Sequence, residues 1–253
     1  MKNVNAIMSI LLVGVSTGVL AQNRNVKKSS QQWIQYYNQS KIEDKWTWSA
    51  DAGYRFNTLF SNRAQYIVRT GFGYQFNRTM KVSAGFAHLG FYTSDKLSKV
   101  EYRPYQEFAI TNAYKHLGIF HRFRVEERFF KNVINGDIQH GHSFNFRFRY
   151  QCMLNITILK LSITNPDKFL AINLGDEIFI NAGKKVVYNV FDQNRWLAGS
   201  FVSFSKSLSI GLTYNSQFAA LNAPDSYNHT DVMWLIIRQN FDLSKHKKHS
   251  SNG

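Results

Sequence analysis

The sequence has little cysteine, little proline and a low mean hydropathy. The single cysteine, Cys152, excludes an internal disulfide, and it also excludes CxxC redox motifs and cysteine-rich zinc sites. Proline occurs only 3 times in 253 residues. The mean hydropathy of −0.33 excludes a helical membrane protein but not a β-barrel, because the lumen and loops of a barrel are polar. Strand pairing and packing must therefore hold the fold together.

Aromatic residues and positive charge are abundant instead. Aromatics make up 15% of the chain, which fits β-strands. The formal net charge of +15 indicates an anionic neighbour, such as nucleic acid, anionic lipid or an acidic polymer. Export, which the N-terminus predicts, weakens the case for nucleic acid and leaves anionic lipid or an acidic polymer.

Residues 1–21 have the three parts of a secretory signal. Lys2 supplies a positive start, residues 7–20 supply an apolar core, and Val19-Leu20-Ala21 supplies a small-residue cleavage site before Gln22. The apolar core is shorter than the roughly 18 residues that a spanning helix needs. No cysteine follows the signal, which excludes an acylated lipoprotein. We expect export to the outer membrane, with outer-membrane lipid and the barrel-assembly and secretion machinery as partners and no nucleic acid.

The stretch at 121–129 shows the pattern that recurs along the chain. Read with a period of two, it separates an apolar face from a charged face. The apolar face has His121, Phe123, Val125 and Phe129, and the charged face has Arg122, Arg124, Glu126 and Arg128. A soluble sheet would turn the apolar face inward. A membrane barrel would turn it towards lipid and leave the charges in the lumen.

The segment at 46–56 favours the membrane barrel. Its length matches the roughly 9 to 11 residues of a tilted membrane strand. Trp46, Trp48, Tyr54 and Phe56 lie at its ends, and alanines occupy the middle of the same face. That distribution is typical of two interfacial aromatic girdles around a hydrocarbon band.

Period-two segments continue to the end of the chain. We predict eleven strands, at 33–37, 46–56, 66–76, 81–93, 107–114, 121–129, 144–152, 169–181, 194–205, 208–218 and 231–243. Single-chain bacterial barrels have even strand numbers. The sequence therefore predicts ten or twelve strands, either with 33–37 outside the barrel or with one strand missed.

The connections between these segments alternate in length. Tight turns are predicted at 77–79, 115–117, 165–167 and 206–207, and long polar links at 94–101, 131–141, 182–193 and 219–230. Such alternation is typical of outer-membrane barrels, which have short periplasmic turns and longer extracellular loops.

The predicted fold is all-β, a transmembrane antiparallel β-barrel of about 10 to 12 strands in a single domain. The signal peptide is assigned to 1–21, a flexible lead-in to 22–30, the barrel to 31–243 and a disordered basic tail to 244–253.

Three motifs resemble a known family. They are HRFRVEERF at 121–129, DEIFIN at 176–181 and DQNR at 192–195. In combination they resemble the domain-of-unknown-function family 2490, whose members are predicted outer-membrane β-barrels of Gram-negative bacteria. The resemblance extends from about Trp33 to Phe241 and supports the architecture. It brings no activity, substrate or catalytic residue.

The charged faces predict a network in the lumen. Its candidate residues are Asp51, Arg55, Arg69, Glu107, Arg122, Arg124, Glu126, Arg128, Arg147, Arg149 and Glu177. One interpretation is a plug of ion pairs, because unpaired buried charges are costly. The other is an arginine-lined path or pocket for an anionic solute. The plug is favoured, because the predicted strand number is below the roughly 16 to 18 that leave an open aqueous channel.

The opening stretch also predicts a specific pairing. Neighbours on one face of a strand are about 6 to 7 Å apart, so Glu126 is too far from Arg124 and Arg128 for tight pairing. Directly opposed residues of antiparallel strands come within about 5 Å. We therefore expect Glu126 to pair across strands, with Arg147 or Arg149.

Other candidate motifs are weaker. His140 and His142 could share a face and bind a metal, but no third ligand can be placed, so solvent-exposed loop histidines are expected. Adjacent His142 and Ser143 would point to opposite faces of a strand and cannot form a catalytic pair. Gly71 and Gly73 fall on the lumen face, where they would relieve crowding.

No catalytic, cofactor-binding or metal-binding residue is assigned, and no cofactor is expected. The sequence predicts a non-enzymatic barrel, either a narrow channel for small anionic solutes or a structural or surface-interaction protein. The alternative is a lipid hydrolase that acts within the bilayer. The oligomeric state stays open.

Overall fold

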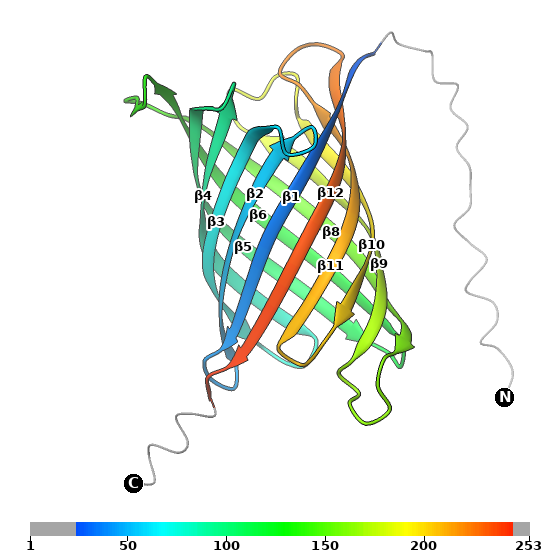
Figure 1. The fold of residues 1–253 in the computed structure, drawn as a ribbon. Coiled ribbons are helices and arrows are strands. Elements are labelled where there is room, and N and C mark those ends of the chain that lie inside the picture. Colours follow the sequence, from blue (N-terminus) through cyan, green and yellow to red (C-terminus); the bar gives the residue numbers. More distant parts are fainter. Residues whose placement is uncertain (1–23, 245–253) are drawn as a thin grey trace, which may run out of the picture.

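The computed structural model describes residues 24–244, and this part of the chain is a β-barrel (Figure 1). Its strands are β1 (Asn25–Lys41), β2 (Trp46–Asn57), β3 (Asn62–Gln75), β4 (Met80–Thr93), β5 (Lys96–Ala113), β6 (Leu117–Ile134), β7 (Asp137–Ile138), β8 (Ser143–Lys160), β9 (Phe169–Ala182), β10 (Phe191–Ser203), β11 (Leu208–Ala220) and β12 (Ser226–Asp242). Among the described residues, no helix is long and apolar enough to cross a membrane.

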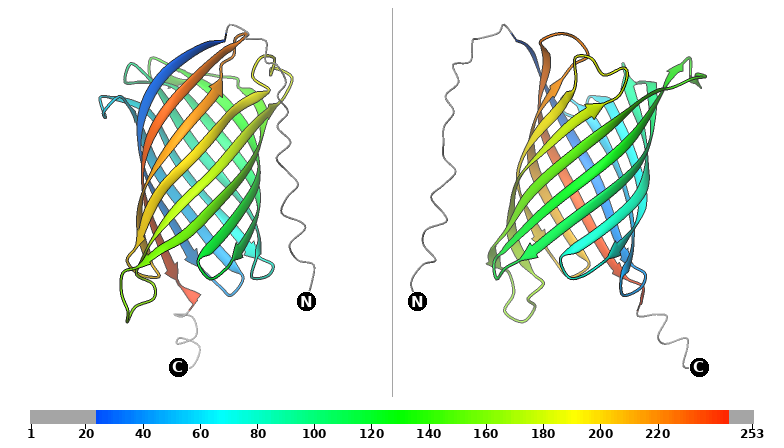
Figure 2. Two further views of the ribbon diagram at one scale, coloured as in Figure 1. Left: turned by 90° about the vertical axis from the view of Figure 1, so that its right-hand side faces the viewer. Right: turned by 180° about the vertical axis from the view of Figure 1, so that it is seen from behind.

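Eleven strands close the barrel, because β7 pairs only with the end of β6. Neighbouring strands are antiparallel except at the closure, where β1 and β12 run parallel in register from Asn25 and Ser226 to Lys41 and Asp242. An odd number of strands requires this parallel pair. It places the start of β1 and the end of β12 at opposite ends of the barrel (Figures 1 and 2).

The predicted even strand number was therefore wrong, whereas the count of eleven segments was correct. The segment at 33–37 lies inside β1 and closes the barrel by pairing with both β12 and β2. Residues 25–30, predicted as part of a flexible lead-in, form the first part of β1. The predicted signal at 1–21 and all but the first residue of the predicted tail lie outside the described residues.

The predicted alternation of short and long connections is confirmed in part: the turns at 76–79, 114–116 and 204–207 are short, and the links at 135–142 and 183–190 are longer. Two connections depart from it. The link expected at 94–101 is only the turn at 94–95 between β4 and β5. The connections at 161–168 and 183–190 are equally long, yet they lie at opposite ends of the barrel. The prediction was wrong at 94–101 because polar residues such as Lys99 and Glu101 continue a strand, which a polar lumen allows.

The two faces of β2 and β6 differ as predicted. Along β6, the Phe123 side chain is 48% exposed on the outer surface, and Glu126 is 0% exposed inside. Aromatic clusters lie near both ends of β2 on the outer surface. Trp46 packs on Tyr74 at one end, with ring centroids 5.1 Å apart, and Tyr54 packs on Phe56 at the other, at 5.0 Å. The exposed aromatic residues of β2 and β6 thus face away from the lumen, whereas other apolar side chains, such as Leu89 and Ile236, line it.

Two glycines make room inside the barrel for the Tyr105 ring. Gly71 and Gly85 are directly opposed on β3 and β4. A Cβ atom on Gly85 would lie 2.4 Å from the Tyr105 hydroxyl, and one on Gly71 would lie 2.8 Å from it. The expectation that the lumen glycine Gly71 relieves crowding is confirmed.

Candidate functional site: the charged lumen

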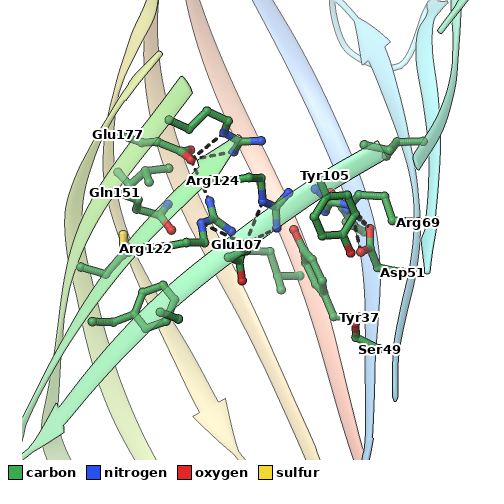
Figure 3. A pocket seen from close by; sticks show the side chains of 18 of the residues that line it. Tyr37, Ser49, Asp51, Arg69, Tyr105, Glu107, Arg122, Arg124, Gln151 and Glu177 are labelled. Carbon is green, nitrogen blue, oxygen red and sulfur yellow. Dashed lines mark hydrogen bonds and ion pairs between the residues drawn. The ribbon is translucent and has the colours of Figure 1, made fainter. Parts of the chain in front are cut away.

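Interior side chains line a cavity of about 1120 Å³. Its lining reaches from Arg78 and Thr79, in the turn after β3, to Ala64 and Phe91, near the other ends of β3 and β4. The cavity therefore extends along most of the lumen. Figure 3 shows part of its wall, where acidic and basic side chains from several strands point towards one another.

Cations dominate this lining. They are Arg55, Arg69, Arg78, Lys81, Arg103, Arg122, Arg124, Arg128, Arg147, Arg149, Arg195 and Arg238. The carboxylates in the lining are Asp51, Glu107, Glu177 and Asp192. Glu101 and Glu126 add two more that are 0% exposed. Twelve cations therefore face six carboxylates in the described part of the chain.

Glu126 is the centre of the ion-paired part. Arg147 Nε donates to Glu126 Oε2 at 2.7 Å, and Arg149 Nη1 donates to Oε1 at 2.6 Å. Glu126 is directly opposed to Arg147 in the register of β6 and β8. The predicted cross-strand pairing is confirmed, with both candidate arginines bound at once. Arg103 Nη1 approaches the same carboxylate at 3.6 Å.

Glu177 on β9 extends the network. Arg149 Nη2 donates to Glu177 Oε1 at 2.6 Å, so this arginine bridges the carboxylates of Glu126 and Glu177. Arg122 Nη2 donates to the same Glu177 oxygen at 2.7 Å. Arg124 Nε donates to Glu107 Oε2 at 2.8 Å, and its guanidinium lies 4.4 Å from the centroid of the Tyr105 ring (Figure 3).

Glu101, Arg103 and Asp192 belong to the same network but were missed from the sequence. Arg103 Nε donates to Glu101 at 2.6 Å, Arg128 Nε donates to it at 2.8 Å, and Arg147 Nη1 donates to Asp192 at 3.0 Å. Glu101 and Asp192 fall in segments predicted as loops. Glu101 and Arg103 are two-residue steps from Glu107, so extending the period-two pattern of β5 would have found them.

We call the interior faces of β5, β6, β8 and β9 the paired wall. It comprises Glu101, Arg103, Glu107, Arg122, Arg124, Glu126, Arg128, Arg147, Arg149 and Glu177. Most of the predicted network residues gather here. Asp51 and Arg69 form a separate pair on β2 and β3, with Arg69 Nε 2.9 Å from Asp51 Oδ1.

Arg55 is the predicted network residue that differs. It forms no ion pair within residues 24–244. Its Nη1 donates to Gln65 at 2.6 Å, its Nε has no hydrogen-bond partner, and its guanidinium lies 3.8 Å from the centroid of the Trp33 ring. Arg195 on β10 lies near the same ring, at 5.3 Å.

Trp234 completes this second group. It is paired with Trp33 in the register of β1 and β12, their ring centroids are 5.2 Å apart, and its Nε1 has no hydrogen-bond partner. We call Trp33, Arg55, Arg195 and Trp234 the tryptophan site. The sequence does not indicate this site, because Trp33 meets Arg55 and Trp234 through the pairing of β1 with β2 and β12, and meets Arg195 only across the folded barrel.

The other motifs fall outside the lumen. His140 and His142 are exposed, and no group of three or more His, Cys, Asp or Glu side chains within 24–244 could hold a metal ion. On the outer face, Ser216 Oγ and His229 Nε2 are 2.8 Å apart. Asp231 Oδ1 is 3.9 Å from the same His229 nitrogen.

The comparisons with known proteins give a family and no activity. No curated protein and no solved structure matches the chain. A family model described as a protein of unknown function (DUF2490) matches residues 30–228, which begin in β1 and end in β12. The match includes the whole paired wall and nearly all of the barrel, and on this basis the chain belongs to the DUF2490 family.

Proposed function

We propose that the protein is a non-enzymatic outer-membrane barrel that forms a narrow, anion-selective channel. The apolar outer surface supports a place in a membrane. Its exposed side chains include Val68 at 52%, Phe72 at 53%, Phe123 at 48% and Phe148 at 46%. Water would not favour so much apolar surface on a monomer. The N-terminal signal predicted at 1–21 supports export to the outer membrane.

The excess of cations in the lumen is the observation that carries anion selectivity. Arginine binds oxyanions through paired N–H groups, and cationic rings are the usual selectivity devices of anion pores. Carboxylates already neutralise much of the paired wall, so the free positive charge comes from residues such as Arg55, Lys81 and Arg238. Residues of the paired wall line the cavity of about 1120 Å³, so space remains inside the lumen beside the ion pairs.

Conductance in planar lipid bilayers tests this function. In a gradient of potassium chloride, we expect single channels of small conductance. Their reversal potential should lie closer to the equilibrium potential of chloride than to that of potassium. Lys81→Glu and Arg238→Glu should shift that potential towards cation selectivity. The matched control is Lys160→Glu, which makes the same charge change at the exposed last residue of β8. No channel activity, or equal shifts in all three variants, would contradict the proposal.

The Ser216–His229 contact favours a second candidate, a lipid hydrolase acting at the outer face. A serine hydroxyl within hydrogen-bond reach of an imidazole is the arrangement of a nucleophile and its general base. Asp231 approaches Nε2, the nitrogen that faces Ser216, and so does not supply the contact to the other ring nitrogen that orients a catalytic histidine. Hydrolysis of vesicle phospholipid, lost in Ser216→Ala and in His229→Gln, would establish this function in place of the channel.

A further inference from the structure

The tryptophan site has hydrogen-bond donors that no protein acceptor satisfies. Arg55 Nε and Trp234 Nε1 are both buried and without a partner. A buried donor without an acceptor costs about 1–3 kcal/mol. Buried polar groups in folded proteins are therefore usually satisfied, and an exception calls for an unseen partner. Here the missing partner must be an acceptor.

Arg55 and Arg195 both lie near the Trp33 ring, and nearby carboxylates do not fully balance their positive charges. Arg55 has only the neutral Gln65 as its acceptor. Arg195 Nε donates to Gln217 at 3.1 Å, and its closest carboxylate contact is Glu177, at 3.8 Å from Nη1. Glu177 is already bound by Arg149 and Arg122 at 2.6 and 2.7 Å. The missing acceptor should therefore also carry negative charge.

The residues of the site border the lumen cavity and are held in place by aromatic contacts. Arg55, Arg195 and Trp234 all line the lumen cavity. Trp33 is 2% exposed and lies within 3.8 Å of Arg55 and 5.3 Å of Arg195, measured from the guanidinium carbons to the ring centroid. The Phe179 ring centroid lies 4.6 Å from the same Arg195 guanidinium. Aromatic faces thus hold the guanidiniums, and neutral amides are the acceptors of their hydrogen bonds, which leaves the two positive charges without a close carboxylate.

We infer that the tryptophan site binds a small oxyanion, a carboxylate or a phosphate, through Arg55, Arg195 and Trp234. A planar or tetrahedral oxyanion offers several acceptor oxygens, which match the paired donors of a guanidinium, whereas chloride offers no such geometry. This site deepens the proposed channel, because it names the solute class that the lumen selects. The role of the site in selecting solutes rests on the proposed channel function, but binding of an oxyanion to the site does not.

Tryptophan fluorescence can report binding directly. We suggest a background with Trp46→Phe, Trp48→Phe and Trp196→Phe, which removes three tryptophans exposed on the outer surface and retains Trp33 and Trp234. The folded barrel in detergent is titrated with acetate, inorganic phosphate or chloride at constant ionic strength. We expect a saturable change with acetate or phosphate and none with chloride. The stronger of the two names the ligand class.

Variants then assign the site. Arg55→Gln and Arg195→Gln should each weaken oxyanion binding by about tenfold or more, because each removes a charge-assisted contact. Lys81→Gln removes a cavity cation outside the site and should leave the affinity unchanged. Absence of saturable binding by the background protein, or equal losses in all three variants, would overturn the inference.

Conductance separates the site from the channel. If oxyanions bind but no current is seen, the site is supported and the proposed function fails. If anion-selective current is seen and neither acetate nor phosphate binds saturably, the channel is supported and the site fails.

Discussion

The paired wall and the tryptophan site both place arginines inside the barrel, but they treat the charge differently. On the paired wall, Arg147 and Arg149 contact Glu126 at 2.6 to 2.7 Å, and Arg149 also contacts Glu177. At the tryptophan site, Arg55 has an amide and an aromatic ring as neighbours. Arg147 and Arg149 thus have carboxylate partners within the protein, whereas Arg55 has none.

This difference separates stability from function. A buried ion pair leaves an uncompensated charge when one partner is removed, so the paired wall should be sensitive to single substitutions. Replacing a cation that has no carboxylate partner leaves no unpaired carboxylate in the barrel. The paired wall is therefore expected to hold the barrel together, and the tryptophan site to bind a solute.

The largest effect is expected at Glu126. Glu126→Gln removes the carboxylate that Arg147 and Arg149 share and should lower the free energy of unfolding by about 3–5 kcal/mol. Urea unfolding, followed by the heat-modifiable mobility of the folded barrel in gels, measures this loss.

A double-mutant cycle sharpens the same test. Adding Arg147→Gln or Arg149→Gln to Glu126→Gln should restore part of the stability, because the second change removes excess positive charge. Strictly additive losses for both pairs would show that these contacts do not carry the stability. A fully stable single variant with altered anion conductance would mean that the paired wall serves the channel instead.

The next largest effect concerns the other face of the paired wall. Phe123 lies between the charged positions of β6, is 48% exposed and is paired in register with Tyr150. Phe123→Arg should cost about 2–4 kcal/mol if this face meets lipid near the bilayer midplane. The matched control is Gln151→Arg, which faces the cavity and is paired in register with Glu177, and it should be mild. Equal losses would mean that lipid does not surround the barrel.

A smaller loss is expected where the glycines support the paired wall. Gly85→Ala would place a methyl group 2.4 Å from the hydroxyl of Tyr105, the ring that contacts Arg124. Such overpacking typically costs about 1–3 kcal/mol. Gly118→Ala in β6 is the control, because the nearest atom to its Cβ is 3.8 Å away. If both variants unfold at the same urea concentration, Tyr105 is not held by this contact.

Much of the paired wall could be predicted from the sequence. The period of two determines which side of a strand each residue faces, and it assigned Arg122, Arg124 and Glu126 to the interior. The expectation of adjacent antiparallel strands then placed Arg147 and Arg149 opposite Glu126. Local periodicity was sufficient, because each of these contacts joins neighbouring strands.

The parts that failed depend on closure of the barrel. The parallel pairing of β1 with β12 joins strands from the two ends of the sequence, and no local sequence pattern predicts which distant strands pair. It moved residues 25–30 into the barrel, and it brought Trp33 next to Trp234 and towards Arg195. The sequence does not place Asp192 in the network, because the polar start of β10 predicts a loop there.

The smallest effect on stability is expected at Arg55. Arg55→Gln removes a cation that has no carboxylate partner, so the barrel loses the Gln65 hydrogen bond and the contact with Trp33 but is freed of an unsatisfied donor. These effects oppose each other, and the net change should stay within about 1 kcal/mol. Arg149→Gln is the matched substitution on the paired wall. It leaves both Glu126 and Glu177 short of a donor and should cost about 3 kcal/mol. Urea unfolding of both variants compares them directly. If Arg55→Gln were as damaging as Arg149→Gln, Arg55 would be a structural residue, and the division between a stabilising wall and a binding site would be lost.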